Sequence, residues 1–175
     1  MKLKLLALLA SAALVKSAMA MDDISLGIPG YAGPGCPPGS ASASLTDDKK
    51  TLSILFDQFL VNVGGNTGKT NARTKCDISV PVHVPQGIQV SLITVDYRGY
   101  NLLPAGASSE FSVEYFFAGQ RGPKYTKTFY GEMDEDYIVT NKLIASSMVW
   151  SRCGEQVILR VNPNLKIIKA AVACN

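Results

Sequence analysis

Residues 76–100, CDISVPVHVPQGIQVSLITVDYRGY, carry the clearest signal for the fold. Apolar and polar residues alternate through the first part of this stretch, which is the pattern of a strand with one buried face. The buried parity holds Ile78, Val80, Val82 and Val84. Cys76 has the same parity, so its side chain is expected to point into the core. Pro81 has no N–H group, which predicts an edge position or an unpaired site in the ladder.

A second strand is expected after the turn at Pro85-Gln86-Gly87. Residues 88–97 are apolar on both parities, which predicts a strand that is buried on both sides or contains a bulge. This strand leaves the apolar region through Asp96-Tyr97-Arg98-Gly99-Tyr100, an aromatic and charged segment.

Towards the N-terminus, residues 51–63 also alternate, but the apolar parity changes around Asp57-Gln58. The change predicts a β-bulge, or alternatively a strand covered on both sides. The glycine-rich residues 64–68 are expected to form a loop. This loop runs into Gly68-Lys69-Thr70, but Val63 stands where a phosphate-binding loop requires glycine, so a nucleotide site is not supported.

Towards the C-terminus, short apolar segments follow one another with glycine or proline in most of the gaps, and no helical period lasts beyond two turns. The expected strands cover 111–117, 125–130, 137–144, 148–153, 156–161 and 165–174. About eight strands at this spacing predict an all-β, single-domain antiparallel β-sandwich of jelly-roll type.

The chain divides into three parts. Residues 1–20 have the lysines, the apolar run and the Ala18-Met19-Ala20 site of a signal peptide, so the protein is expected to be secreted or periplasmic. Residues 21–48 are rich in glycine, proline and serine and are expected to be irregular. Residues 49–175 are expected to form the β-sandwich, and no later segment has the length of a membrane span.

The charge balance argues against a nucleic-acid partner. The whole chain has 17 basic and 14 acidic residues, and three of the basic ones lie in the signal peptide, so 17 minus 3 leaves 14 basic residues against 14 acidic ones. A neutral mature chain without a basic run does not attract nucleic acid or anionic membranes.

No catalytic residue is assigned. His83 is the only histidine, and it stands on the polar face of an ordinary strand without a G-x-S-x-G motif elsewhere. A glycosidase would instead need two facing carboxylates, for which the candidates are Asp57, Asp96, Glu110, Glu114 and the acidic residues of 132–136.

The acidic segment GEMDEDY, residues 131–137, offers a possible calcium site through Glu132, Asp134 and Asp136, since carboxylates supply the oxygen ligands that Ca²⁺ prefers. The alternative is a solvated acidic turn. No other cofactor is expected, because the cysteines and the single histidine are too far apart in sequence to suggest zinc.

Exposed aromatic residues are the candidates for ligand binding. Tyr97 and Tyr100 flank Arg98, Asp96 shares a strand face with Arg98 and could pair with it, and Trp150 precedes another arginine. These residues predict a contact surface for an extracellular glycan or protein. The alternative is that they pack over a sheet edge.

Several segments resemble a secreted family, the domain-of-unknown-function family numbered 4360. The matching segments are GPGCPPGSAS at 33–42, the FDQF strand and its glycine pair at 56–65, residues 73–100, YFFAG at 115–119 and CGEQVILRVN at 153–162. The resemblance implies export and a single all-β domain, and it implies no activity.

The four cysteines allow three complete pairings. Cys36, Cys76 and Cys153 fall inside the matching segments, whereas Cys174 does not. The expected pairs are Cys76 with Cys153, both at strand boundaries, and Cys36 with Cys174, which would fasten the N-terminal segment to the last strand.

Together these observations favour an extracellular binding or structural module over an enzyme. The alternatives are a hydrolase of extracellular polymer that uses paired carboxylates and a secreted inhibitor.

Overall fold

The structure is a computed structural model that describes residues 24–48, 51–144 and 148–168; the signal peptide and Cys174 lie outside them. The described chain forms antiparallel strands and one 3-10 turn at Gly65–Thr67, inside the expected loop. The strands are β1 (Ser25–Leu26), β2 (Gly30–Ala32), β3 (Ala41–Leu45), β4 (Leu52–Phe56), β5 (Asn71–Lys75), β6 (Asp77–His83), β7 (Thr94–Leu103), β8 (Ser108–Phe117), β9 (Lys124–Tyr130), β10 (Met133–Lys142) and β11 (Gln156–Ile168).

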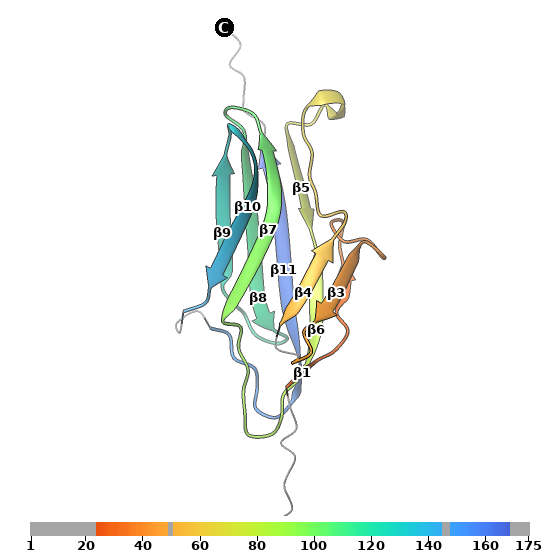
Figure 1. Cartoon of the computed structure of the whole chain (residues 1–175), viewed down its shortest axis with the longest axis vertical. Coiled ribbons are helices and arrows are strands. Elements are labelled where there is room, and N and C mark those ends of the chain that lie inside the picture. Colours follow the sequence, from red (N-terminus) through yellow and green to blue (C-terminus); the bar gives the residue numbers. More distant parts are fainter. Residues whose placement is uncertain (1–23, 49–50, 145–147, 169–175) are drawn as a thin grey trace, which may run out of the picture.

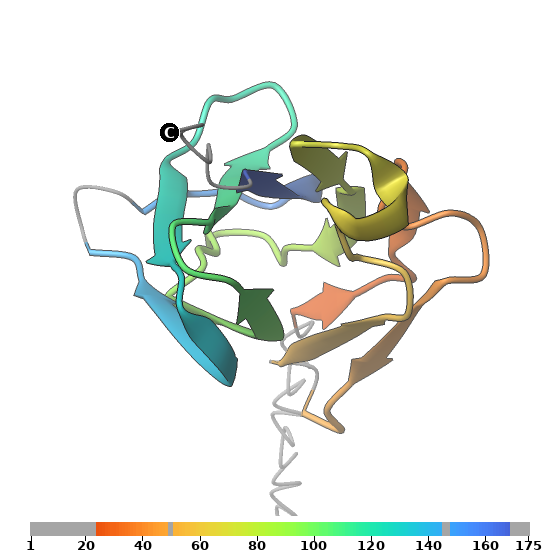
Figure 2. The same ribbon diagram turned by 90° about the horizontal axis from the view of Figure 1, so that it is seen from above.

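The strands pack as two layers, which confirms the predicted antiparallel sandwich (Figure 1). One layer is a seven-stranded sheet of order β1-β6-β11-β8-β9, in which β2 also pairs with β6 and β5 with β11. The other layer consists of two separate ribbons, β10-β7 and β3-β4. Seen from above, the two ribbons lie together on one side of the sandwich (Figure 2).

The last strand, β11, lies in the middle of the large sheet. It pairs with β5 and β6 along one edge and with β8 along the other. Two strands were expected here, separated at Pro163, but the structure has one strand of 13 residues. The carbonyl of Pro163 accepts a hydrogen bond from the N–H of Cys76, at 3.0 Å. Because proline has no N–H to return, the ladder is interrupted at this point, and the interruption separates β5 from β6.

Pro81 has the same effect on the other edge of β6. Its carbonyl accepts a hydrogen bond from Gly27, at 2.8 Å, and no N–H completes the pair. The neighbouring chain therefore forms β1 as far as Leu26 and resumes as β2 at Gly30. The unpaired site predicted at Pro81 is confirmed.

The predicted strand over residues 88–97 begins only at Thr94. Residues 84–93 carry the chain from the large sheet to the β7–β10 ribbon, and Ser91 forms a single bridge with Trp150. The apolar residues on both parities thus belong to a crossing segment between the layers, in contact with both. Residues 148–153 are likewise not a strand, since they also form a crossing segment between the layers, and Trp150 makes only the single bridge to Ser91.

The predicted bulge at Asp57-Gln58 is also absent, because β4 ends at Phe56. An irregular segment follows, and Phe59 contacts the core under both ribbons. The change of apolar parity therefore marks the end of a strand.

The core lies between the two layers. The expected one-sided strands are confirmed, since the alternate residues of β6 and β8 are buried. Their inward side chains include Ile78, Val80, Val82, Phe111, Val113, Tyr115 and Phe117.

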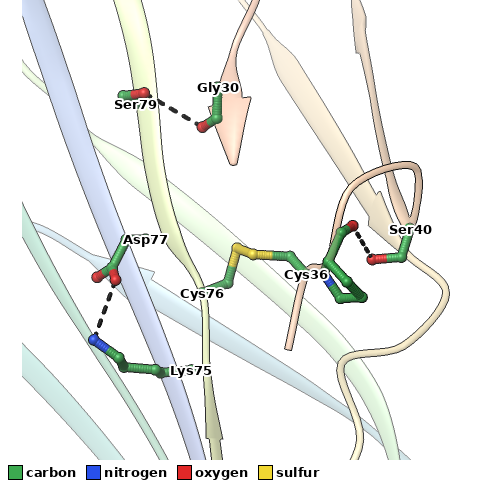
Figure 3. Close-up of a disulfide and its surroundings, with 8 residues drawn as sticks. Gly30, Cys36, Ser40, Lys75, Cys76, Asp77 and Ser79 are labelled. Atoms are coloured by element: carbon green, nitrogen blue, oxygen red, sulfur yellow. Dashed lines mark hydrogen bonds and ion pairs between the residues drawn. A yellow bond between two sulfur atoms is a disulfide. The ribbon is translucent and has the colours of Figure 1, made fainter. Parts of the chain in front are cut away.

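The N-terminal segment is not irregular, because it contributes β1, β2 and β3. Cys36 in this segment forms a disulfide with Cys76, and both cysteines are buried (Figure 3). The expected pairs Cys76–Cys153 and Cys36–Cys174 are therefore wrong. Cys76 faces Pro163 on β11, whereas Cys153 is exposed and precedes β11, whose first residue, Gln156, is seven residues or about 23 Å along the strand from Pro163.

A pair of tyrosines joins β7 to β8 inside the core. The hydroxyls of Tyr97 and Tyr115 are hydrogen-bonded to each other, and Asn141 donates to the hydroxyl of Tyr115 at 3.4 Å. The ring of Tyr97 also packs against Phe111, with centroids 4.6 Å apart. Burial, followed by the neighbouring hydroxyl of Tyr115, raises the pKa of Tyr97 well above its ordinary value.

Removing the disulfide is expected to destabilise the protein strongly. The bond joins residues separated by 40 positions. In the chain-entropy model, the double variant Cys36→Ala/Cys76→Ala loses about 4 kcal/mol of unfolding free energy. Urea denaturation of the secreted protein measures this loss. The matched control is Cys153→Ala, which truncates an exposed cysteine and is expected to change stability by less than about 0.5 kcal/mol. An equal loss in the control would contradict the pairing.

Tyr97→Phe is expected to change how stability depends on pH. The folded-state pKa of Tyr97 is raised, so folding keeps its proton while the unfolded chain releases it above about pH 10. The wild type therefore loses stability as pH rises through 10, and the variant should lose less. At pH 7 the variant should cost about 1 kcal/mol for the lost hydrogen bond. Denaturation curves between pH 7 and 11 test this, with Tyr130→Phe on the exposed surface as control. Identical pH slopes for wild type and Tyr97→Phe would contradict it.

Candidate functional site

The segment Asp96-Tyr97-Arg98-Gly99-Tyr100 lies on β7 and is divided between its two faces. Tyr97 faces the core, as described above. Gly99 also faces inwards beneath the ring of Tyr137, where an added Cβ would lie 2.6 Å from Cζ of that ring. The glycine therefore makes room for an aromatic neighbour on β10. Asp96, Arg98 and Tyr100 point outwards and are exposed. Tyr97 has the opposite parity on the strand, so it is not the surface residue that was predicted.

Pairing between β7 and β10 brings two segments together that are separate in sequence. Tyr100 pairs with Asp136, Leu102 with Asp134, and Arg98 with Ile138. The outward residues of this ribbon form one surface, which we call the ribbon face. Its members are Thr94, Asp96, Arg98, Tyr100 and Leu102 of β7 and Asp134, Asp136, Ile138, Thr140 and Lys142 of β10.

Hydrogen bonds between the strands hold two of its carboxylates. The hydroxyl of Tyr100 donates to Asp134, and this bond raises the pKa of Tyr100. The hydroxyl of Thr140 donates to Asp96 at 2.7 Å. The carboxylate of Asp96 is therefore bonded across the ribbon, and it does not form the ion pair with Arg98 that its position suggested.

Large apolar side chains stand among these charges. Tyr100 is 58% exposed, and Leu102 and Ile138 are each 65% exposed. Three carboxylates, one guanidinium and the ammonium of Lys142 give the ribbon face a net charge of −1 (2 minus 3). The combination of exposed apolar groups and an acidic surround suits contact with another molecule and offers no activated nucleophile.

The acidic segment is a strand rather than a turn. β10 begins at Met133 and pairs with β7 along its length, so Asp134 and Asp136 lie on a ladder, while Glu132 precedes it. In the described part of the chain, no three or more His, Cys, Asp or Glu side chains are grouped so as to hold a metal ion. Calcium binding by these residues stays a prediction.

Trp150 is half exposed but lies away from the ribbon face. It forms a bridge with Ser91, before the start of β7. Tyr100 is six residues beyond Thr94, the first residue of β7, which is about 20 Å along a strand. The structure therefore does not bring Trp150 together with Tyr100.

The carboxylates proposed for hydrolysis are dispersed. Asp96 lies on the outer side of the β7–β10 ribbon, Glu110 and Glu114 belong to β8 in the opposite layer, and Asp57 follows β4. The described surface has one concavity beside β3 and another around Pro163, and neither is lined by more than one of these four carboxylates.

Two shallow concavities lie elsewhere on the described surface. One, of about 330 Å³, is mainly apolar and lies between β3 and the segment from Leu26 to Tyr31. The other, of about 210 Å³, is polar. Its polar lining includes Arg73, Lys75, Asp77, Glu114, Lys124 and Asn162. Of these residues only Glu114 is a candidate from the sequence, because each is an ordinary polar residue on its own strand.

In the described residues, no helix has the length and apolar character needed to cross a membrane.

Comparison with known proteins gives a family and a relative. An uncharacterized secreted protein of Arthroderma benhamiae is 34% identical over 138 residues, which cover 78% of this chain and 56% of that protein. The chain thus spans little more than half the length of this relative. The secreted relative and the buried disulfide confirm that the protein is secreted. A family model, the domain of unknown function DUF4360, matches residues 22–173, and the chain therefore belongs to the DUF4360 family.

Proposed function

We propose that this protein is an extracellular binding module and that its ribbon face binds a protein partner. The observation that carries the proposal is the placement of Tyr100, Leu102 and Ile138, all more than half exposed, on one ordered surface with charged neighbours. Contiguous exposed apolar groups with a polar surround are typical of protein interfaces.

The composition of the ribbon face agrees with this proposal. Tyrosine and arginine are the residues most often found to dominate binding energy at interfaces, and Tyr100 and Arg98 stand two residues apart on one strand face. Tyr100 is restrained by its hydrogen bond to Asp134, so little side-chain entropy is lost when it is covered.

The shape of the ribbon face also favours a protein over a small ligand. Neither of the two concavities contains any residue of the ribbon face, whereas small ligands bind in concave sites. The net charge of −1 favours a partner with a basic surface, because complementary charges speed association.

A comparison of variants tests the proposal. The triple variant Arg98→Ala/Tyr100→Ala/Ile138→Ala removes the centre of the ribbon face without changing inward residues. Purified wild-type protein is used to capture partners from the culture medium, and the affinity for each captured protein is then measured. We expect the triple variant to weaken binding by about 30-fold or more, as for the loss of interface hot spots. Binding should also weaken as salt rises.

The control is Leu55→Ala on β4, which truncates an equally exposed apolar side chain in the other ribbon. It should bind as wild type. A partner whose affinity is unchanged by the triple variant, or lost equally in the control, would contradict the ribbon face as the site.

A further inference from the structure

The polar groove lies on the outer surface of the large sheet, where the ladder between β11 and its neighbours is interrupted at Pro163. Asn162 and Asn164 stand on either side of this proline and line the groove. Figure 3 shows the side chains of Lys75, on β5, and Asp77, on β6, pointing away from Cys36. The groove and the disulfide therefore occupy opposite faces of the sheet.

Strand pairing arranges the groove residues in two rows. In one row Asn162 pairs with Glu114, and Glu114 pairs with Lys124. In the other row Lys75 pairs with Asn164, and Asn164 pairs with Ser112. Donors and acceptors therefore lie side by side across four strands, with neighbouring strands about 4.8 Å apart.

The two asparagines differ in their hydrogen bonding. The side chain of Asn164 accepts a bond from Nε of Arg73 at 2.6 Å and donates to the hydroxyl of Ser112 at 3.3 Å. The side-chain oxygen of Asn162 is buried and has no hydrogen-bond partner among the described residues. Buried acceptors are nearly always paired, so this oxygen needs a donor from beyond the described residues, such as a ligand hydroxyl or an ordered water.

The neighbouring charges restrict what that donor can be. A ligand with a net negative charge would face Asp77 and Glu114, and one with a net positive charge would face Arg73, Lys75 and Lys124, of which Lys75 is already paired with Asp77 at 3.2 Å. A hydroxyl group is both a donor and an acceptor. Several adjacent hydroxyls can therefore donate to Asn162 and Glu114 while they accept from Lys124.

The size of the groove sets the size of the ligand. About 210 Å³ is below the roughly 300–1,000 Å³ of sites for drug-sized ligands. It suits one six-membered sugar ring. We propose that the groove binds a neutral pyranose residue of an extracellular glycan, with its hydroxyls hydrogen-bonded to Asn162, Glu114 and Lys124. This site is separate from the ribbon face and does not depend on it.

Titration by NMR of the ¹⁵N-labelled secreted protein tests the proposal. The probes are the methyl glycosides of glucose, galactose, mannose and N-acetylglucosamine, with sodium glucuronate and inorganic phosphate as charged probes. We expect at least one neutral glycoside to shift the side-chain amide signals of Asn162, with a Kd of about 1 mM, as for a small polar ligand in an open groove.

Two variants locate the site. Asn162→Leu should weaken binding of that glycoside by about 10-fold or more, because it removes the buried acceptor. Lys124→Ala changes an exposed residue with little risk to folding, and it should weaken binding by about threefold or more. The matched control is Gln156→Leu, the same kind of change at the other end of β11 and outside the groove. It should bind as wild type.

Several results would overturn the proposal. They are the absence of a shift with every neutral glycoside, binding of phosphate or glucuronate in preference to all of them, and unchanged affinity in both groove variants. The triple variant of the ribbon face must retain glycoside binding, and Asn162→Leu must retain the protein partner. The two sites can therefore fail separately.

Discussion

The hydrogen bonds of β11 are the constraint on which the rest of this structure depends. The strand runs through the centre of the large sheet and supplies partners to three other strands. At Pro163 it can accept a hydrogen bond from Cys76 but cannot return one. The interruption falls where Cys76 turns inwards to its disulfide and where the polar groove opens on the other face. One missing N–H group thus coincides with the main covalent tie and with a concave site.

Two prolines act in the same way, and each stands in a strand paired on both edges. Strands with proline are usually placed at the edge of a sheet. Here the carbonyls of Pro81 and Pro163 point towards a neighbouring segment whose strand is interrupted opposite the proline. Each of these segments is therefore divided into two short strands. The cost is one hydrogen bond at each site, and the sheet otherwise continues.

Local patterns predicted some elements well because they depend on burial alone. Every second residue of β6 and β8 is buried along the whole strand, and Ser112 of β8 is the one buried residue out of phase. Where both parities are apolar, as in residues 88–93, the pattern cannot distinguish a doubly buried strand from a segment that crosses between layers. The disulfide was missed for a related reason, since it depends on which strands lie opposite each other.

The candidate sites show the same limit. The sequence indicated Tyr100 and the acids of 134–136 separately, and only the register of β7 with β10 makes them one surface. The sequence also indicated Tyr97 as a surface residue, because its neighbours Asp96 and Arg98 are polar. The alternation of the strand nevertheless places Tyr97 inside. The groove could not be predicted, because its residues come from five strands and none is unusual in its own segment.

The position of β11 has a consequence for the order in which the chain is made and exported. Among the described strands, the one that completes the large sheet comes last in the sequence, and β5, β6 and β8 can pair with it only after it has been made. Pairings this distant along the chain form slowly, because much of the chain must be ordered before they are made. The large sheet therefore cannot close until residue 168 has left the ribosome or the export channel.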